Sequence, residues 1–206
     1  MSSEDLNKIL TINSYLIIFF NNLCNFKCRT CGPRFSTSWY DDYQTTRHSE
    51  SHNEFPKTLM FPGKTKEHLL EEITEHLPYV ERIYFAGGEP MMQQSGLEGF
   101  ISYIKYNINA NAYFEVETNG TIMPSEDLLY KIQLWNCSPK LRNSGMDNAM
   151  TFKPDVIKEL NKKNTIFKFV VNSDKEWQEI ERDYLPIVER EKIYLMPAGE
   201  NQDLLN

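Results

Sequence analysis

Three cysteine residues lie within eight positions of the chain, at the spacing C-x3-C-x2-C. They are Cys24, Cys28 and Cys31, and they follow directly after the apolar run Tyr15–Phe20. Thiols at this spacing, leaving a strand and entering a loop, can converge on one inorganic centre. Three is an odd number for disulfides and one ligand short of a closed tetrahedral zinc site. The spacing therefore favours a four-iron cluster held by three thiolates, with the fourth iron left open.

Two simpler interpretations of the cysteines remain open at this point. A distant histidine could complete a zinc site, or the three thiols could be unrelated buried side chains. The chain has four histidines, and His48 and His52 are spaced like metal ligands. They lie in a segment rich in serine and glutamate, which is more typical of solvated side chains. The fourth cysteine, Cys137, is far from the other three in the sequence, and we expect it to be a thiol of the core.

The elements that must position these thiols alternate between strands and helices. Apolar runs with many β-branched and aromatic residues predict strands that are buried on both faces. Between them lie amphipathic segments that begin with good N-caps, such as Ser125 and Ser173. The predicted strands cover residues 14–20, 82–86, 112–117, 135–138, 165–171 and 192–196. The predicted helices cover residues 65–77, 94–106, 153–162 and the segments that begin at 125 and 173, with a short helix within 37–46.

Strands that alternate with helices indicate parallel β-α units. Six such units are too few for a closed eight-stranded barrel of ~250 residues. We therefore predict an α/β fold, a partial (β/α)6 TIM-like barrel of parallel strands with outer helices. The sequence predicts one domain, residues 1–206, with a polar insertion at 33–64. Residues 202–206 look like the first turn of a sixth helix, which suggests a C-terminal truncation or a short family member.

Composition excludes several classes of function. A net charge of −7 argues against a nucleic-acid backbone as the main partner, because phosphate binding needs clustered Lys and Arg. No apolar run reaches the ~20 residues that a membrane-spanning helix needs. The acidic, polar N-terminus does not resemble a secretory signal. Clustered cysteines indicate a metal centre in a reducing compartment, so we expect a cytoplasmic protein.

Candidate ligand-binding residues follow one strand after another. In parallel α/β folds ligands bind at the carboxyl ends of the strands. Paired glycines let a backbone approach a ligand closely, a glutamate there can accept hydrogen bonds from an ammonium group, and a second glutamate can accept both hydroxyls of a ribose. An ordinary turn with a solvated carboxylate would show the same residues. The candidates are Gly87, Gly88 and Glu89 after the second strand, Glu117 and Asn119 after the third, Ser138, Pro139 and Lys140 after the fourth, and Pro197 after the sixth.

The cysteine spacing resembles that of the radical S-adenosylmethionine (radical SAM) enzymes, and the Gly-Gly-Glu turn one β-α unit later resembles the motif that holds the amino group of S-adenosylmethionine. The resemblance implies a [4Fe-4S] cluster on Cys24, Cys28 and Cys31. It also implies S-adenosylmethionine chelated to the open iron, a 5′-deoxyadenosyl radical, and an electron donor such as flavodoxin or ferredoxin. The family has a (β/α)6 partial barrel with the cluster at its mouth.

Residues 84–199 resemble one subfamily more closely, the 7-carboxy-7-deazaguanine synthases. The most specific part is Ser138-Pro139-Lys140 followed by Asn143-Ser144-Gly145. The resemblance implies conversion of 6-carboxy-5,6,7,8-tetrahydropterin to 7-carboxy-7-deazaguanine, assisted by Mg2+, in queuosine and related deazapurine biosynthesis. It implies that Gly87, Gly88, Glu89, Glu117, Asn119, Ser138, Pro139 and Lys140 bind S-adenosylmethionine and that Ala86 and Pro197 contact the substrate.

The first part of the chain departs from this subfamily. Gly32-Pro33 replaces the usual Asp-Thr pair of the Mg2+ site, Ala86 stands where Thr is usual, and the expected segment ahead of the cysteines is missing from residues 1–13. Instead, Cys31–Trp39 resembles radical SAM maturases that act on peptides. A radical activase or peptide maturase, with 33–64 as a docking surface, is therefore the alternative enzyme. A non-catalytic zinc or iron-sulfur protein is a third possibility, and the use of Mg2+ and dimerisation are left open.

Overall fold

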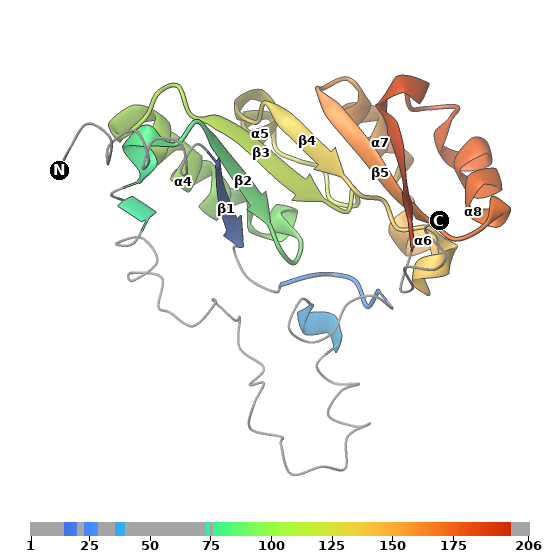
Figure 1. Ribbon diagram of the computed structural model, residues 1–206. Coiled ribbons are helices and arrows are strands. Elements are labelled where there is room, and N and C mark those ends of the chain that lie inside the picture. The colour runs from blue at the N-terminus through green and yellow to red at the C-terminus, as the bar shows by residue number, and fades with distance from the viewer. Residues whose placement is uncertain (1–14, 20–22, 29–35, 40–72, 75, 199–206) are drawn as a thin grey trace, which may run out of the picture.

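Six parallel strands form one sheet in the order in which they occur along the chain. The computed structural model describes residues 15–19, 23–28, 36–39, 73–74 and 76–198 (Figure 1). The fold confirms the predicted α/β class, with six parallel strands and intervening helices as in a partial TIM-like barrel. The strands are β1 (Tyr15–Phe19), β2 (Arg82–Ala86), β3 (Tyr113–Thr118), β4 (Leu134–Cys137), β5 (Thr165–Val171) and β6 (Ile193–Pro197).

Helices connect the strands from β2 onward. The predicted N-caps are confirmed, since Ser125 accepts a hydrogen bond from the Leu128 amide and Ser173 forms a capping box with Glu176. The α-helices are α4 (Gln94–Asn107), α5 (Glu126–Lys131), α6 (Asn148–Thr151), α7 (Pro154–Asn161) and α8 (Asp174–Glu179). Shorter turns are η1 (Thr37–Trp39), η2 (Leu77–Tyr79), η3 (Pro90–Gln93), η4 (Arg142–Ser144), η5 (Ile180–Tyr184, π-helical) and η6 (Arg190–Lys192).

Most of the predicted insertion lies outside the described residues. So do residues 65–72 of the predicted helix 65–77 and residues 40–46 of the predicted helix within 37–46. Residues 37–39 form the 3-10 turn η1. Among the described residues, no helix is long and apolar enough to span a membrane.

Alternation along the strands gives the sheet two different faces. One face packs against the helices through large buried side chains such as Phe85, Phe114, Trp135 and Phe167. Helices α4, α5 and α7 lie behind the sheet on this side in Figure 1. We call the opposite side the inner face. It carries Tyr84, Glu115, Glu117, Asn136 and Lys168, which alternate along their strands with the side chains of the core.

An ion pair lies on the inner face near the amino ends of the strands. Arg82 Nη1 lies 2.7 Å from Glu115 Oε1, and the guanidinium stacks 4.6 Å from the centre of the Tyr113 ring. The Glu115 side chain is 5% exposed, and the Tyr15 hydroxyl lies 3.4 Å from its other oxygen. Arg82, Glu115 and Tyr15 thus form their polar contacts with one another. The candidate ligand-binding residues lie at the opposite, carboxyl ends of the strands.

Candidate functional site

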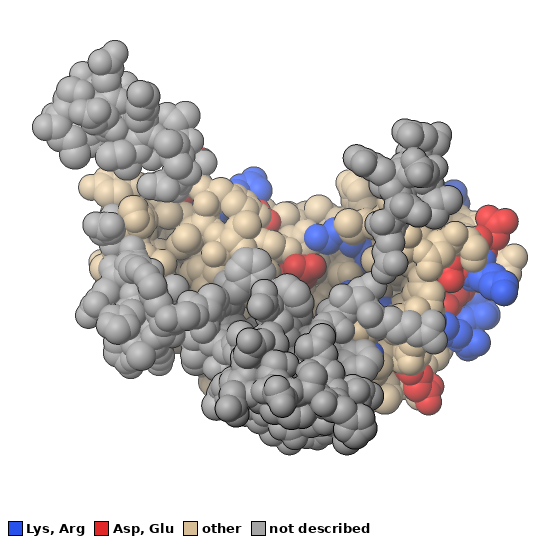
Figure 2. All heavy atoms as spheres, turned by 60° about the horizontal axis from the view of Figure 1, so that its bottom comes forward, with Lys and Arg blue, Asp and Glu red and all other residues tan. Residues whose placement is uncertain are grey.

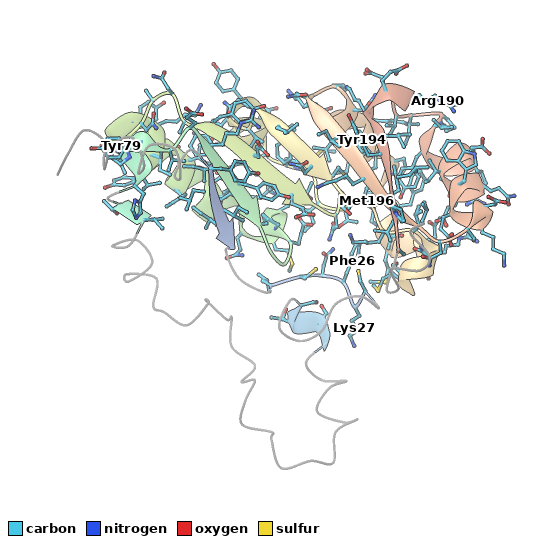
Figure 3. All side chains as sticks on the ribbon, in the orientation of Figure 1. Phe26, Lys27, Tyr79, Arg190, Tyr194 and Met196 are labelled. Carbon is cyan, nitrogen blue, oxygen red and sulfur yellow. The ribbon has the colours of Figure 1, made fainter. Side chains whose placement is uncertain are left out.

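The cysteine loop, residues 23–28, lies at the carboxyl end of the sheet, directly after β1 (Figure 1). Phe26 is 1% exposed and anchors the loop beneath the strand ends, where Figure 3 labels it beside Lys27. Cys24 is half-buried and Cys28 is buried, and both are present as thiols. Two thiols in one loop are a donor set that fits an iron-sulfur cluster.

Cys31 lies outside the described residues, as do Gly32 and Pro33. Within the described part of the chain, no group of three or more Cys, His, Asp or Glu side chains could hold a metal ion. The loop as described therefore supplies two of the three predicted ligands, and the third stays a prediction.

Two serine hydroxyls hold the cysteine loop from one side. Ser36 Oγ donates to the carbonyl of Phe26 at 2.6 Å, and Ser38 Oγ donates to the carbonyl of Cys24 at 2.6 Å. Ser36 is 1% exposed, so its hydrogen bond is shielded from water. Both serines belong to the predicted polar insertion, and this role was not predicted from the sequence. Hydroxyls a few residues after a cysteine motif were the only available signal.

The Gly-Gly-Glu turn holds the loop from the other side. The Glu89 amide donates to the carbonyl of Leu23 at 2.7 Å. Gly88 has φ +58°, and a Cβ added there would lie 2.3 Å from the Leu23 carbonyl oxygen. Gly88 is thus required by the close approach of the cysteine loop, in addition to any cofactor.

A closed triangle of side chains joins the cysteine loop to the turn after β3. Asn119 Nδ2 donates to Asn25 Oδ1 at 2.8 Å, and Asn25 Nδ2 donates to Thr121 Oγ1 at 3.0 Å. Thr121 Oγ1 in turn donates to Asn119 Oδ1 at 2.6 Å. Asn119, predicted to bind the cofactor, therefore uses its carboxamide to hold the loop. Asn25 and Thr121 were not predicted.

Glu89 is a buried carboxylate that ties the turn after β2 to the turn after β3. Its side chain is 1% exposed. Oε1 accepts hydrogen bonds from the Met91 amide at 3.0 Å and the Thr118 hydroxyl at 2.8 Å, and Oε2 accepts one from the Asn119 amide at 2.6 Å. Burial raises the pKa of Glu89, while these donors and the Lys140 ammonium oppose the rise. Glu89 was predicted to bind the cofactor, but three protein donors already use most of the hydrogen-bonding capacity of its carboxylate.

Glu117 lies on the inner face beside Tyr84. The Tyr84 hydroxyl donates to Glu117 Oε2 at 2.9 Å. Burial, followed by the charge of Glu117, raises the pKa of Tyr84, so the phenol keeps its proton. This hydrogen bond fixes one carboxylate oxygen of Glu117.

The turn after β4 carries Ser138, Pro139 and Lys140. The Ser138 amide donates to the carbonyl of Thr118 at 2.8 Å, and Lys140 Nζ donates to Ser138 Oγ at 3.0 Å. Just beyond it, the Arg142 amide donates to both carboxylate oxygens of Glu179, at 3.3 and 3.2 Å. Burial raises the pKa of Glu179, and the hydrogen bond from Arg142 opposes the rise. Helix α8 therefore braces this turn through Glu179.

The remaining predicted residues are more scattered. Ala86 ends β2 and is 3% exposed, whereas Pro197 ends the edge strand β6 and is exposed. Cys137 is fully buried, and a Cβ on Gly120 would lie 2.7 Å from its sulfur, which confirms the core thiol. The structure thus gathers the predicted residues of β1 to β4 and leaves Pro197 on a separate strand.

Two comparisons show which known proteins this chain is similar to. Residues 18–136 match the family profile described as the Radical SAM superfamily. The chain is also 30% identical, over 129 residues, to a protein named 7-carboxy-7-deazaguanine synthase from Pyrobaculum aerophilum. This match covers 62% of the chain and 54% of the relative, so the chain spans about half the length of the curated relative it matches.

Proposed function

The chain belongs to the radical SAM superfamily, and we propose that it converts 6-carboxy-5,6,7,8-tetrahydropterin into 7-carboxy-7-deazaguanine. Membership implies a [4Fe-4S] cluster and S-adenosylmethionine as cofactors. The similarity to a protein named 7-carboxy-7-deazaguanine synthase supports the specific reaction. So do the residues Ser138-Pro139-Lys140 and Asn143-Ser144-Gly145.

One structural observation supports the cofactor site on which the proposal depends. The cysteine loop is hydrogen-bonded both to the Gly-Gly-Glu turn and to the turn after β3. In our assignment Cys24, Cys28 and Cys31 hold the cluster, and the two turns hold S-adenosylmethionine next to it. When bound, the two cofactors supply the one-electron chemistry that starts the reaction, and the protein orients them and excludes water.

The cofactor contacts follow from the groups that remain available. We assign the methionine amino group to the backbone carbonyls of Gly87 and Gly88, with Glu89 chiefly ordering their turn. The second oxygen of Glu117 accepts from the ribose. Ser138 and Lys140 face the cofactor carboxylate, with Pro139 and Asn119 shaping their turns.

The overall conversion balances as rearrangement and ring contraction of the pterin with loss of one molecule of ammonia. It is redox-neutral, so the external electron donor, of the flavodoxin or ferredoxin class, serves to start the reaction. In this assignment Ala86 and Pro197 border the substrate. Gly32 and Pro33, which replace the usual Mg2+-binding pair in the sequence, lie outside the described residues.

The peptide-maturase alternative rested on the similarity of residues 31–39 to maturases. Two of these residues, Ser36 and Ser38, hold carbonyls of the cysteine loop. This internal role accounts for the serines without a peptide substrate. We therefore place the pterin reaction first.

The test is anaerobic turnover by the reconstituted, reduced protein. S-adenosylmethionine cleavage is followed with and without 6-carboxytetrahydropterin, and 7-carboxy-7-deazaguanine is measured by mass spectrometry. Product that depends on both compounds is expected. Cleavage to 5′-deoxyadenosine without this product would contradict the pterin reaction and favour a different substrate.

A further inference from the structure

One buried polar side chain on the inner face has no role in the site described above. Asn136 is 8% exposed, and it lies between Trp135 and Cys137, which are both fully buried in the core. Because side chains alternate along a strand, the carboxamide of Asn136 points away from the helices and onto the inner face. Figure 2 looks at the molecule from the side of the strand ends, where acidic and basic side chains lie close together.

The carboxamide of Asn136 makes no hydrogen bond to another described residue. A buried amide normally satisfies its donors and acceptor, and leaving them unmade costs free energy. The amide atoms of Asn136 are not fully enclosed by protein, so they can be reached from the inner face. Two donors and one acceptor are therefore directed at the space in front of the sheet.

Lys168 shares this face on the neighbouring strand. It alternates with Phe167 and Phe169, which are buried in the core, so its side chain projects onto the inner face beside Ile166 and Val170. It is half-buried, and no described carboxylate pairs with it. A half-buried ammonium group without an anion is a ready partner for a ligand's negative charge.

The strand register places the two residues beside the cofactor assignment. In the strand register, Asn136 pairs with Glu117 on β3 and with Ile166 on β5. Lys168 lies two residues further toward the carboxyl end. Strand spacing of ~4.8 Å and a rise of ~3.3 Å per residue put the Cα atoms of Asn136 and Lys168 roughly 8 Å apart. Their side chains can converge on one group.

We propose that Asn136 and Lys168 bind the carboxylate of the substrate and so determine its specificity. This inference rests on the proposed function and adds the substrate's acid group to it. The amide and the ammonium group both donate to the carboxylate, while Ile166 and Val170 offer apolar surface to a flat ring. Glu117, one strand away, places the ribose of the cofactor next to that ring. The substrate class is a pterin-like heterocyclic acid.

Binding of two fluorescent probes tests the proposal without turnover. Pterin-6-carboxylate and pterin differ only in the acid group, and both are titrated into the reconstituted holoprotein with S-adenosylmethionine present. The wild type is expected to bind the acid at least ~10-fold more tightly, as for a hydrogen-bonded charge pair. Lys168→Met abolishes this preference and leaves the affinity for pterin unchanged, and Lys168→Arg retains it. Lys175→Met, at an exposed lysine of α8, is the matched control and changes neither affinity.

Asn136→Asp provides a second readout, because a negative charge beside the acid weakens pterin-6-carboxylate more than pterin. The cofactor also carries a carboxylate, so its affinity is measured in each variant. If Lys168→Met loses affinity for S-adenosylmethionine but keeps its preference for pterin-6-carboxylate, the proposal is overturned. It is also overturned if the variant loses affinity for both pterins equally, or if the wild type binds neither pterin. An acid preference that depends on Lys168 in a protein that makes no deazaguanine would support this inference while contradicting the proposed reaction.

Discussion

Asn119 Nδ2 donates to Asn25 Oδ1 at 2.8 Å and links two turns that are 94 residues apart in the chain. Thr121 closes the triangle by contacting both asparagines. The Asn119 amide also donates to Glu89, so the cysteine loop and the turns after β2 and β3 form one hydrogen-bonded unit. The thiols are therefore positioned by the same residues that shape the cofactor turns.

This unit predicts that Asn25 and Asn119 act together on the cluster. Asn25→Ala removes two side-chain hydrogen bonds and Asn119→Ala removes three, because Asn119 Oδ1 also accepts from the Thr121 amide; each is worth about 1 kcal/mol. Both variants are expected to release iron to a chelator faster than wild type, and the double variant is expected to be no worse than the worse single one. Asn109→Ala is the control, because that carboxamide holds the carbonyls of Leu77 and Val80 at the amino ends of the strands. Additive effects, or equally rapid iron release in Asn109→Ala, would contradict the clamp.

Gly88 predicts a strong effect of one added methyl group. Gly88→Ala places a Cβ 2.3 Å from the Leu23 carbonyl oxygen at a positive φ, which costs about 1–3 kcal/mol in backbone strain and displaces the cysteine loop. We expect less bound iron per chain and a lower melting temperature. Gly96→Ala in α4 is the matched control, since its Cβ meets nothing within 4 Å and gains about 0.5–1 kcal/mol of helix stability. Normal iron content in Gly88→Ala would show that the loop does not need this close approach.

Glu89 predicts a pH dependence of stability. Burial raises the pKa of Glu89 above its ordinary value of 4.5. The native state therefore binds a proton at this carboxyl group more tightly than the unfolded state does. The contribution of Glu89 to the free energy of unfolding is therefore largest below pH 4.5 and falls as pH rises through the native pKa. Glu89→Gln removes this fall, although it also weakens the hydrogen bond from Asn119. Denaturant unfolding from pH 4.5 toward neutral measures the difference between the two proteins. That difference shifts in favour of Glu89→Gln as pH rises, and a constant difference would contradict the raised pKa.

Glu179 predicts a remote effect on cofactor affinity. Glu179→Ala removes the carboxylate that accepts from the Arg142 amide and loosens the turn carrying Lys140. We expect the Kd for S-adenosylmethionine to rise about threefold to tenfold, with iron content unchanged. Glu181→Ala, at an exposed carboxylate of the following turn, is the control. An unchanged Kd in Glu179→Ala would show that the brace does not act on the cofactor.

The sequence predicted the sheet well because each strand is a local signal. The bounds of β2 and β5 are as predicted, and the described bounds of the other four strands differ from the predicted ones by one residue at each end, since apolar runs of this kind have few alternatives. The short turns η3 and η4, the helix α6 and the π-helical segment η5 were missed. Each covers five residues or fewer, too short for a periodic pattern to be visible.

The site was harder to predict, because its key contacts are non-local. Cys24 and Cys28 could be identified from spacing alone. The roles of Asn25, Asn119 and Ser36 could not, since each depends on which turn of the folded chain comes within hydrogen-bond distance. Glu89 shows the same limit. Its position was predicted, but its burial among three protein donors follows only from the packing of β2 against β3.

The most direct test of the account is electron paramagnetic resonance of the reconstituted, dithionite-reduced protein, recorded with and without S-adenosylmethionine. The account predicts a [4Fe-4S]+ signal that changes on addition of S-adenosylmethionine and disappears in Cys24→Ala. A protein that binds zinc in place of iron, or a cluster signal that S-adenosylmethionine leaves unchanged, would contradict the assignment of an open iron beside the cofactor turns.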